Sequence, residues 1–481
     1  MLFVSWSFAV FLPVVLMLHY WGRRQGWQVG VLTLASFVFY GWANPSLVPL
    51  LALSALVNAV ASQELIAAGR APLRRRTVLA GALVYNVGVL AFFKYAALLG
   101  RVLLPEALWI RWGPWLQDIP LPVGISFFTF QGISLIVDTW HAGARGIAGL
   151  PPPVTGREVG LHYVKVTFFK AFFPQLVAGP IVKAGEFFHQ IRPKRLRDVQ
   201  WDAAVRTLIL GFFLKMVVAD NLKEVTEGLR YPEFLMLPRI NLIALLYAFS
   251  FQILADFAGY SIIAIGLGRL FGYELPVNFN HPYLSRSITE FWRRWHITLS
   301  SWLREYLYIP LGGNRSGTVV TYRNLFIVMF LGGLWHGAAW SYAIWGSAHG
   351  LLLAGERLMF NRHREPVPDG WTPGGVVRAG ITFSAVSALW LLFKLPEFRH
   401  VIEYVRSVVH NGGAPQIQAL YVIAVFSAPV VLWELWGALA RVRARWTLAR
   451  RERVSWAGYS VMMFLIVTNS GPPGTFIYFQ F

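Results

Sequence analysis

Two histidines in apolar surroundings are the residues of this chain best suited to chemistry. His296 stands in Phe291-Trp-Arg-Arg-Trp-His296, and His336 follows in the apolar stretch Leu-Trp-His-Gly. An ionisable side chain is costly to place at membrane depth, and where one occurs it usually serves chemistry or transport. A neutral imidazole is also what a general base requires near neutral pH. The pair therefore indicates a reaction carried out inside a membrane protein.

The surroundings of His336 leave a catalytic and a structural role open. The stretch 324–354 carries no formal charge, which predicts one spanning segment with His336 near its middle. Gly333 and Gly337 have the small-xxx-small spacing that permits close helix packing or close approach of a ligand. The structural alternative is a neutral histidine bonded to a neighbouring helix's carbonyl. In a continuous helix, His349 would lie about 220° further round and face elsewhere.

His296 falls in a segment whose pattern predicts an amphipathic helix. If 290–306 is one helix, His296 joins the tryptophans on its apolar face, whereas Glu290, Arg293 and Arg304 lie on the opposite side. Such a helix is expected to lie at a membrane interface. His296 would then be its only ionisable residue on the apolar face, although amphipathic helices often carry a histidine there without a function.

Composition sets the class of protein that must position these residues. The 481 residues are 56% hydrophobic and 14% charged, against about 25% charged residues in soluble chains. Apolar runs of roughly 20 residues, the length that crosses a bilayer, recur along the whole sequence. We expect an all-α polytopic integral membrane protein with roughly ten to twelve transmembrane helices. No internal repeat is visible, which favours a single domain over 1–481.

The net charge of +20 is explained by topology better than by nucleic acid. Arginines cluster between apolar runs, at 23–24 after the first run and 74–76 after the third, and positive loops stay in the cytoplasm. The N-terminus is therefore expected outside the cytoplasm, and nucleic acid is not an expected partner. Basic clusters on both sides of 161–180 are best reconciled by a re-entrant, broken helix there, compatible with Pro174.

Other reaction classes find little support. The chain contains no cysteine, which excludes disulfides and a cysteine nucleophile. It has no His-Glu-x-x-His motif and no ligand spacing among its histidines, so no metal is expected. Asp256 is the one acid deep within an apolar run, where it must be paired, protonated or exposed to water. It orients a histidine or pairs with an arginine.

Several longer stretches make the sequence recognisable. The chain resembles the membrane-bound O-acyltransferase family, and within it the bacterial alginate O-acetyltransferase branch. The stretches that carry this resemblance are Leu121-Pro-Val-Gly-Ile-Ser-Phe-Phe-Thr-Phe130, Phe173-Pro-Gln-Leu-Val-Ala-Gly-Pro-Ile181, Asp256-Phe-Ala-Gly-Tyr260, Asn278-Phe-Asn-His-Pro-Tyr283, Ser285 to His296, Trp302 to Arg315, Gly333-Leu-Trp-His-Gly337 and Phe476 to Phe481. Two departures are Ile262, where relatives often have Asp, and Lys183, where they often have Arg.

The resemblance implies a multi-helix fold in which a cytoplasmic funnel meets an outward-facing funnel, with signature residues over about 121–354 of this sequence. It implies His336 as the catalytic histidine and His296 as the second histidine of the signature. The candidate substrate-binding residues are Asp256, Trp335, Arg293, Arg304, Asn314 and Arg315. The arginines would meet the phosphates of a coenzyme, with Arg315 beside its Gly-Gly turn the first candidate.

The expected activity is transfer of acetyl from cytoplasmic acetyl-CoA across the bacterial inner membrane, for O-acetylation of an exported, alginate-like polysaccharide. No bound cofactor is expected. The expected partners are periplasmic acetyltransferase proteins of an exopolysaccharide acetylation complex and membrane lipid. Alternatives are transfer of D-alanine to teichoic acid, O-acylation of peptidoglycan or lipid, and a proton-coupled transporter. A transporter more often shows repeated halves, which this sequence lacks.

Overall fold

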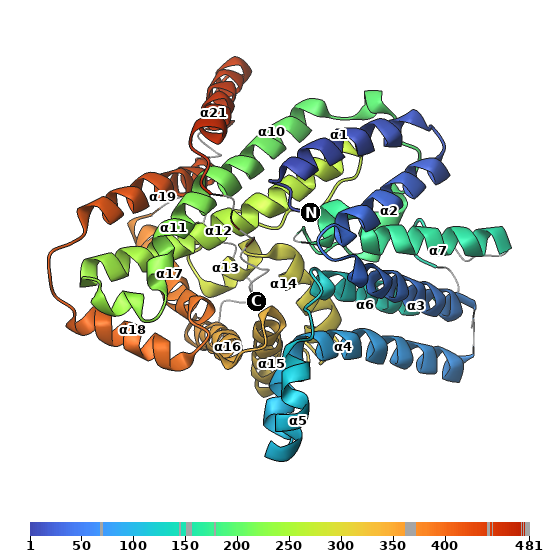
Figure 1. Ribbon diagram of the computed structural model, residues 1–481, viewed down its shortest axis with the longest axis horizontal. Coiled ribbons are helices and arrows are strands. Elements are labelled where there is room, and N and C mark those ends of the chain that lie inside the picture. Colours follow the sequence, from blue (N-terminus) through green and yellow to red (C-terminus); the bar gives the residue numbers. More distant parts are fainter. Residues whose placement is uncertain are drawn as a thin grey trace. The chain divides into compact units, whose positions relative to one another are not determined.

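Helices build both parts of this protein (Figure 1). The computed structural model describes residues 1–67, 71–143, 146–150, 156–177, 179–360, 372–439, 443–444, 446–472, 474 and 476. Over these residues it contains no β-strand, only an isolated bridge between Ile147 and Leu150. The all-α prediction is therefore confirmed. The chain forms two compact units, Met1–Thr207 with Ile263–Pro276, and Leu208–Ile262 with Val277–Phe481.

The first unit is a bundle in which α3 packs against α4, α6 and α7. Its helices are α1 (Trp6–Trp21), α2 (Gln25–Gly41), α3 (Val48–Ala67), α4 (Pro72–Leu103), α5 (Glu106–Gln117), α6 (Ile125–Ala142), α7 (Gly156–Ala171), α8 (Phe173–Leu176) and α9 (Ala184–Phe187). The break expected within 161–180 is present between α7 and α8, where Pro174 occupies the first turn of α8. Re-entry of this segment into the membrane remains a prediction.

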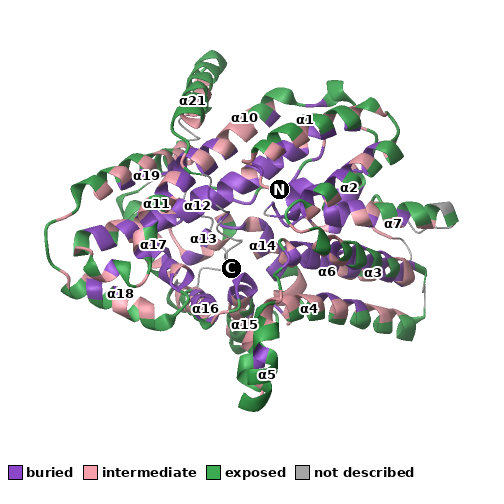
Figure 2. Ribbon diagram, viewed as in Figure 1, coloured by how far each residue is buried: buried purple, intermediate pink, exposed green. Residues whose placement is uncertain are grey.

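The second unit carries both histidines. Its helices are the end of α10 (Trp201–Phe212), the π-helix η5 (Phe213–Ala219), α11 (Asp220–Thr226), most of α12 (Arg239–Leu270), α13 (Ile288–Arg294), α14 (Ile297–Leu303), the π-helical turn η9 (Arg304–Tyr308), α15 (Thr318–His336), α16 (Trp340–Phe360), α17 (Pro373–Lys394), α18 (Phe398–His410), α19 (Ile417–Ala438) and α21 (Leu448–Thr468). Figure 2 shows α12 buried over most of its length and α21 largely exposed.

Membrane-spanning character follows from helix length and apolarity. Among the described residues, six helices are long and apolar enough to cross a bilayer: Pro45–Ala67, Pro72–Leu103, Arg239–Leu270, Thr318–His336, Pro373–Lys394 and Ile417–Ala438. A shorter apolar helix spans Trp6–Trp21. The multi-pass membrane fold is therefore confirmed, whereas the larger number of ten to twelve spans is not reached by these criteria.

The expected single span over 324–354 is wrong, because the chain turns back after His336. Helix α15 ends at His336, and α16 begins at Trp340 and packs along α15. The hairpin is tight because Gly333 and Gly346 face each other: a Cβ on Gly333 would lie 3.0 Å from the Cα of Gly346. His336 thus stands at a helix end beside a turn. The predicted direction of His349 assumes one continuous helix and therefore does not apply.

A single helix over 290–306 is also wrong. Helix α13 ends at Arg294, His296 adopts the left-handed conformation at φ +43° and ψ +53°, and a new helix starts at Ile297. Glu290, expected on the polar side, is instead buried, and its Oε1 lies 2.6 Å from Arg294 Nη2. Arg293 is exposed as expected. The left-handed residue bends the chain, so His296 sits at a corner inside the protein.

Replacing Gly346 should open the hairpin that ends at His336. A Cβ on Gly346 would lie 2.2 Å from the backbone oxygen of Met329, so Gly346→Ala forces α15 and α16 apart. We expect a loss of about 1–3 kcal/mol of stability, measured as a lowered thermal unfolding temperature in detergent. The matched control is Gly355→Ala on the same helix, whose Cβ meets nothing within 4 Å. Equal unfolding temperatures for the two variants would contradict the close contact.

Candidate functional site

The corner at His296 is held by backbone hydrogen bonds to the loop that precedes α13. The amide of Asn280 donates to the carbonyl of Arg294 at 2.9 Å, and the amide of Ile297 donates to the carbonyl of Asn278 at 2.9 Å. These two bonds bracket His296 on both sides. They stabilise a left-handed conformation that costs a non-glycine residue roughly 1–2 kcal/mol. The ring position is therefore fixed by the backbone.

The side chain of Asn278 sets the orientation of the His296 ring. Its Oδ1 accepts hydrogen bonds from the backbone amide of Thr298 at 3.3 Å and from Thr298 Oγ1 at 2.9 Å, and lies 3.1 Å from His296 Nδ1. A backbone amide can only donate, which identifies this atom as the amide oxygen. His296 Nδ1 must then donate its proton to it. In the neutral ring the basic lone pair is consequently on Nε2.

Trp335 connects the two predicted histidines. Its ring centroid lies 6.0 Å from that of His296 and 5.0 Å from that of His336. His336 also packs edge-on against Trp345 at 5.3 Å and Phe393 at 4.9 Å. His296 is fully buried and His336 is 3% exposed. The structure therefore brings both histidines and Trp335 into one aromatic cluster shielded from bulk water.

A small apolar pocket borders His336. Its volume is about 110 Å³, below the range of about 300–1,000 Å³ typical of sites for larger ligands. Its lining is formed by Trp292, Leu299, Ser300, Leu303, Val328, Met329, Gly332, His336, Trp345 and Leu353. The α14 residues that follow His296 form one wall, whereas His296 itself does not line the pocket. Of the two histidines, His336 is the one that lines this pocket.

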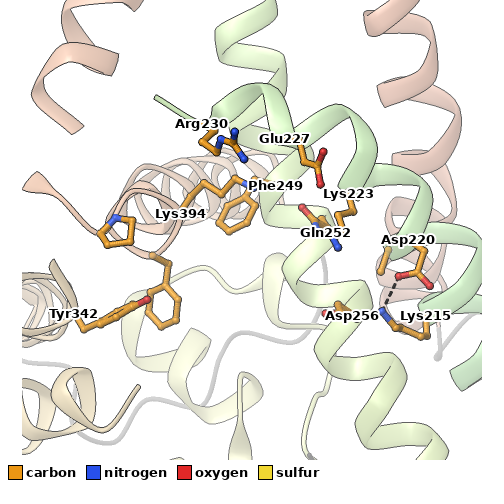
Figure 3. A pocket seen from close by; sticks show the side chains of 13 residues that line it. Lys215, Asp220, Lys223, Glu227, Arg230, Phe249, Gln252, Asp256, Tyr342 and Lys394 are labelled. Carbon is orange, nitrogen blue, oxygen red and sulfur yellow. Dashed lines mark hydrogen bonds and ion pairs between the residues drawn. The ribbon is translucent and has the colours of Figure 1, made fainter. Parts of the chain in front are cut away.

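A second pocket is larger, with a volume of about 340 Å³, and it carries charged side chains (Figure 3). It is lined by Lys215, Ala219, Asp220, Lys223, Glu227, Arg230, Phe249, Gln252, Asp256, Tyr342, Phe393, Lys394 and Pro396. Phe393 belongs to this wall and also contacts the His336 ring. Phe393 therefore lies next to both the charged pocket, which it lines, and the imidazole that lines the apolar pocket.

Asp256 pairs with a lysine that the sequence argument overlooked. Its Oδ1 lies 2.8 Å from Lys215 Nζ, which also bonds Asp220 Oδ1 at 2.6 Å. All three side chains are buried. Asp256 also lines the charged pocket. The overlooked signal is a solitary lysine within the apolar run 208–219, a position that by itself suggests function.

The remaining predicted binding residues lie on the surface. Arg293, Arg304, Asn314 and Arg315 are all exposed, and none of them lines either pocket. The turn before α15 is shaped by Gly312 at φ +104° and Gly313 at φ +57°. The amide of Arg315 donates to the carbonyl of Gly312 at 3.2 Å. In the part of the chain that the structure describes, no group of three metal-binding side chains is assembled.

Comparison with known proteins finds similar chains. The model of the membrane-bound O-acyltransferase family matches residues 158–392. A Pseudomonas putida protein named "Probable alginate O-acetylase AlgI" is 36% identical over 415 residues, covering 85% of this chain and 80% of that protein. The "Peptidoglycan O-acetyltransferase" of Helicobacter pylori is 34% identical over 79% of this chain and 74% of its own. The "Teichoic acid D-alanyltransferase" of Bacillus subtilis is 25% identical over 58% and 70%.

Removing the amide of Asn278 should release the His296 ring. In Asn278→Ala the carbonyl-type acceptor for Nδ1 is lost, so the ring should no longer favour the tautomer with its proton on Nδ1. Nitrogen-15 NMR of histidine-labelled protein measures this, with the His296 signal assigned by its loss in His296→Gln. The matched control is Asn280→Ala, whose side chain is exposed. An unchanged His296 tautomer in Asn278→Ala would refute the assigned role.

Proposed function

The chain belongs to the membrane-bound O-acyltransferase family, and from this premise we propose that it moves acetyl from cytoplasmic acetyl-CoA across the bacterial inner membrane for O-acetylation of an exported polysaccharide. The family makes the protein an O-acyltransferase. The observation that carries the proposal is the position of His336. It lines a small apolar pocket, and its ring contacts Phe393, which lines the charged pocket.

His336 serves as the general base in the proposed reaction. Its imidazole removes the proton from an acceptor hydroxyl, whose oxygen attacks the thioester carbonyl of acetyl-CoA. The tetrahedral intermediate then expels the coenzyme thiolate, the C–S bond breaks, and the imidazolium returns the proton to the sulfur. His296 acts as a positioning residue, because Trp335 contacts both its ring and that of His336. The buried setting keeps water from competing for the thioester.

The small pocket supports acetyl as the transferred group. An acyl chain entering it meets mainly apolar walls, such as Leu303 and Val328. A D-alanyl group carries an ammonium, which would be costly to bury there without an acidic partner. Long fatty chains exceed a pocket of about 110 Å³. These features favour acetyl over the D-alanyl and lipid-acyl alternatives that the family also presents.

We propose that the acceptor polysaccharide binds in the charged pocket. Lys223, Arg230 and Lys394 give it several cations, alongside Glu227 and the Lys215 cluster. Cationic groups suit the acidic polymer named by the alginate relatives. The peptidoglycan relative, at 34% identity, keeps peptidoglycan as a second candidate. In the proposed pathway the N-terminus lies in the periplasm, and periplasmic acetyltransferase proteins act with this protein as partners in modifying the polysaccharide.

Removing the imidazole of His336 should abolish acetyl transfer and leave the protein folded. Loss of a positioned general base typically costs about 10²–10⁴ in rate. Purified His336→Ala protein should therefore consume acetyl-CoA and form acetyl esters about 10²–10⁴ times more slowly than the wild type at equal concentration. Before purification, the two proteins should be equally abundant in the membrane. His410→Ala, a change on exposed α18, serves as the control. Near-normal acetyl transfer by His336→Ala would show that another group is the base.

Enlarging the small pocket should relax the choice of acyl group. Leu303→Ala shortens a side chain that lines the pocket beside His336, which leaves room for a longer acyl chain. The ratio of kcat/KM for butyryl-CoA to kcat/KM for acetyl-CoA should therefore rise by about 10-fold or more. Competition between the two thioesters with one acceptor measures the ratio. Leu331→Ala is the matched control, because Leu331 is 41% exposed and does not line the pocket. If Leu303→Ala and Leu331→Ala share the wild-type ratio, the acyl group binds elsewhere.

A further inference from the structure

The second unit contains a segment far along the chain that docks onto the helices beside the site. We define the docked segment as residues 469–472, 474 and 476. The amide of Gly471 donates to the carbonyl of Met216 at 2.9 Å, and Asn221 Nδ2 donates to the carbonyl of Asn469 at 2.9 Å. Both anchors lie on or next to the π-helix η5, whose wider turn changes the partners of its backbone groups. The segment is thus seated by specific bonds.

Lys215 joins the docked segment to the buried carboxylates. Its Nζ bonds the carbonyl of Gly474 at 3.3 Å, in addition to Asp220 and Asp256. Gly474 is pressed against this cluster, since a Cβ there would lie 2.8 Å from Asp220 Oδ1. Asp220 is held in turn by Lys215. There is consequently no room for a side chain at position 474 without lifting the segment.

From the carboxylate cluster, packing leads to His296. Phe476 is fully buried and stacks near Tyr260 at 4.4 Å and Phe257 at 5.8 Å between ring centroids. Phe257, which directly follows Asp256 on α12, stands edge-on to the His296 ring at 4.6 Å and 90°. The docked segment therefore supports the face of α12 that contacts this histidine.

We infer that Phe476 and Gly474 are positioning residues, through which the docked segment holds Phe257 against His296 and so sets the geometry for acyl transfer. The inference rests on the proposed function for its kinetic readout. Its physical basis is the set of contacts that hold the docked segment in place. The segment is hydrogen-bonded to η5, linked to α12 through Lys215, and packed on Phe257. A displacement of about 1 Å at a catalytic group can cost roughly 100-fold in rate.

Two matched pairs of variants test this inference. Gly474→Val should lift the docked segment, whereas Gly458→Val on α21 meets nothing within 4 Å. Phe476→Ala removes the buried ring, whereas Phe464→Ala removes one that is 63% exposed. We expect Gly474→Val and Phe476→Ala to lower kcat of the folded protein about 10- to 100-fold, with KM for acetyl-CoA close to that of their controls. Phe476→Ala should also lower the thermal unfolding temperature, because it empties a buried site. Phe476→Leu should recover part of the loss.

A second readout does not depend on the reaction. The nitrogen-15 signal of His296 should shift in Gly474→Val and Phe476→Ala and stay in place in both controls. Control-like kcat together with an unmoved His296 signal would overturn the inference. If the wild-type protein does not use acetyl-CoA at all, the proposed function fails, and the His296 signal alone then decides whether the docked segment positions this residue. Lys215→Met would not distinguish a positioning role from a structural one, because it would leave two buried carboxylates without their lysine and so destabilise the protein.

Discussion

Polar groups buried in a membrane protein must find their partners within the protein, because the bilayer core offers no water. This constraint explains how the buried polar side chains of the site are arranged. Lys215 is surrounded by Asp220 and Asp256, and Asn278 satisfies the amide and hydroxyl of Thr298 together with His296. Each set of bonds ties segments distant in sequence. The same bonds that make burial tolerable therefore fix the positions of the groups proposed to react.

The hydrophobic pattern predicted the all-α membrane class and singled out the two histidines as candidate site residues. Both predictions depend on local composition. Apolar length is enough to indicate a membrane helix, and a histidine within such a stretch is conspicuous. The family resemblance covered the same residues. What the sequence could not give was the path of the backbone between them, since a run without charges reads the same whether it continues or folds back.

Two errors have a common physical origin. The run 324–354 and the segment 290–306 were both interpreted with one continuous helical period, yet His336 precedes a turn and His296 occupies a left-handed corner. Close approach of Gly333 to Gly346 and backbone pairing of Asn278 with Ile297 decide these breaks. Both are contacts between separate segments, and periodicity along one segment carries no information about them. The lysine at position 215 was different, because its isolation among apolar residues was visible.

The left-handed backbone at His296 also determines which replacement removes the imidazole of this positioning residue without disturbing the corner. Alanine removes the imidazole together with its bond to Asn278, and it leaves a residue with a Cβ in a conformation that costs roughly 1–2 kcal/mol. Asparagine visits it more readily and is a short polar group that can face Asn278. His296→Asn is thus the replacement that removes the ring and best preserves the backbone around it. Comparing it with His296→Ala separates the effect of losing the imidazole from the effect of losing the corner.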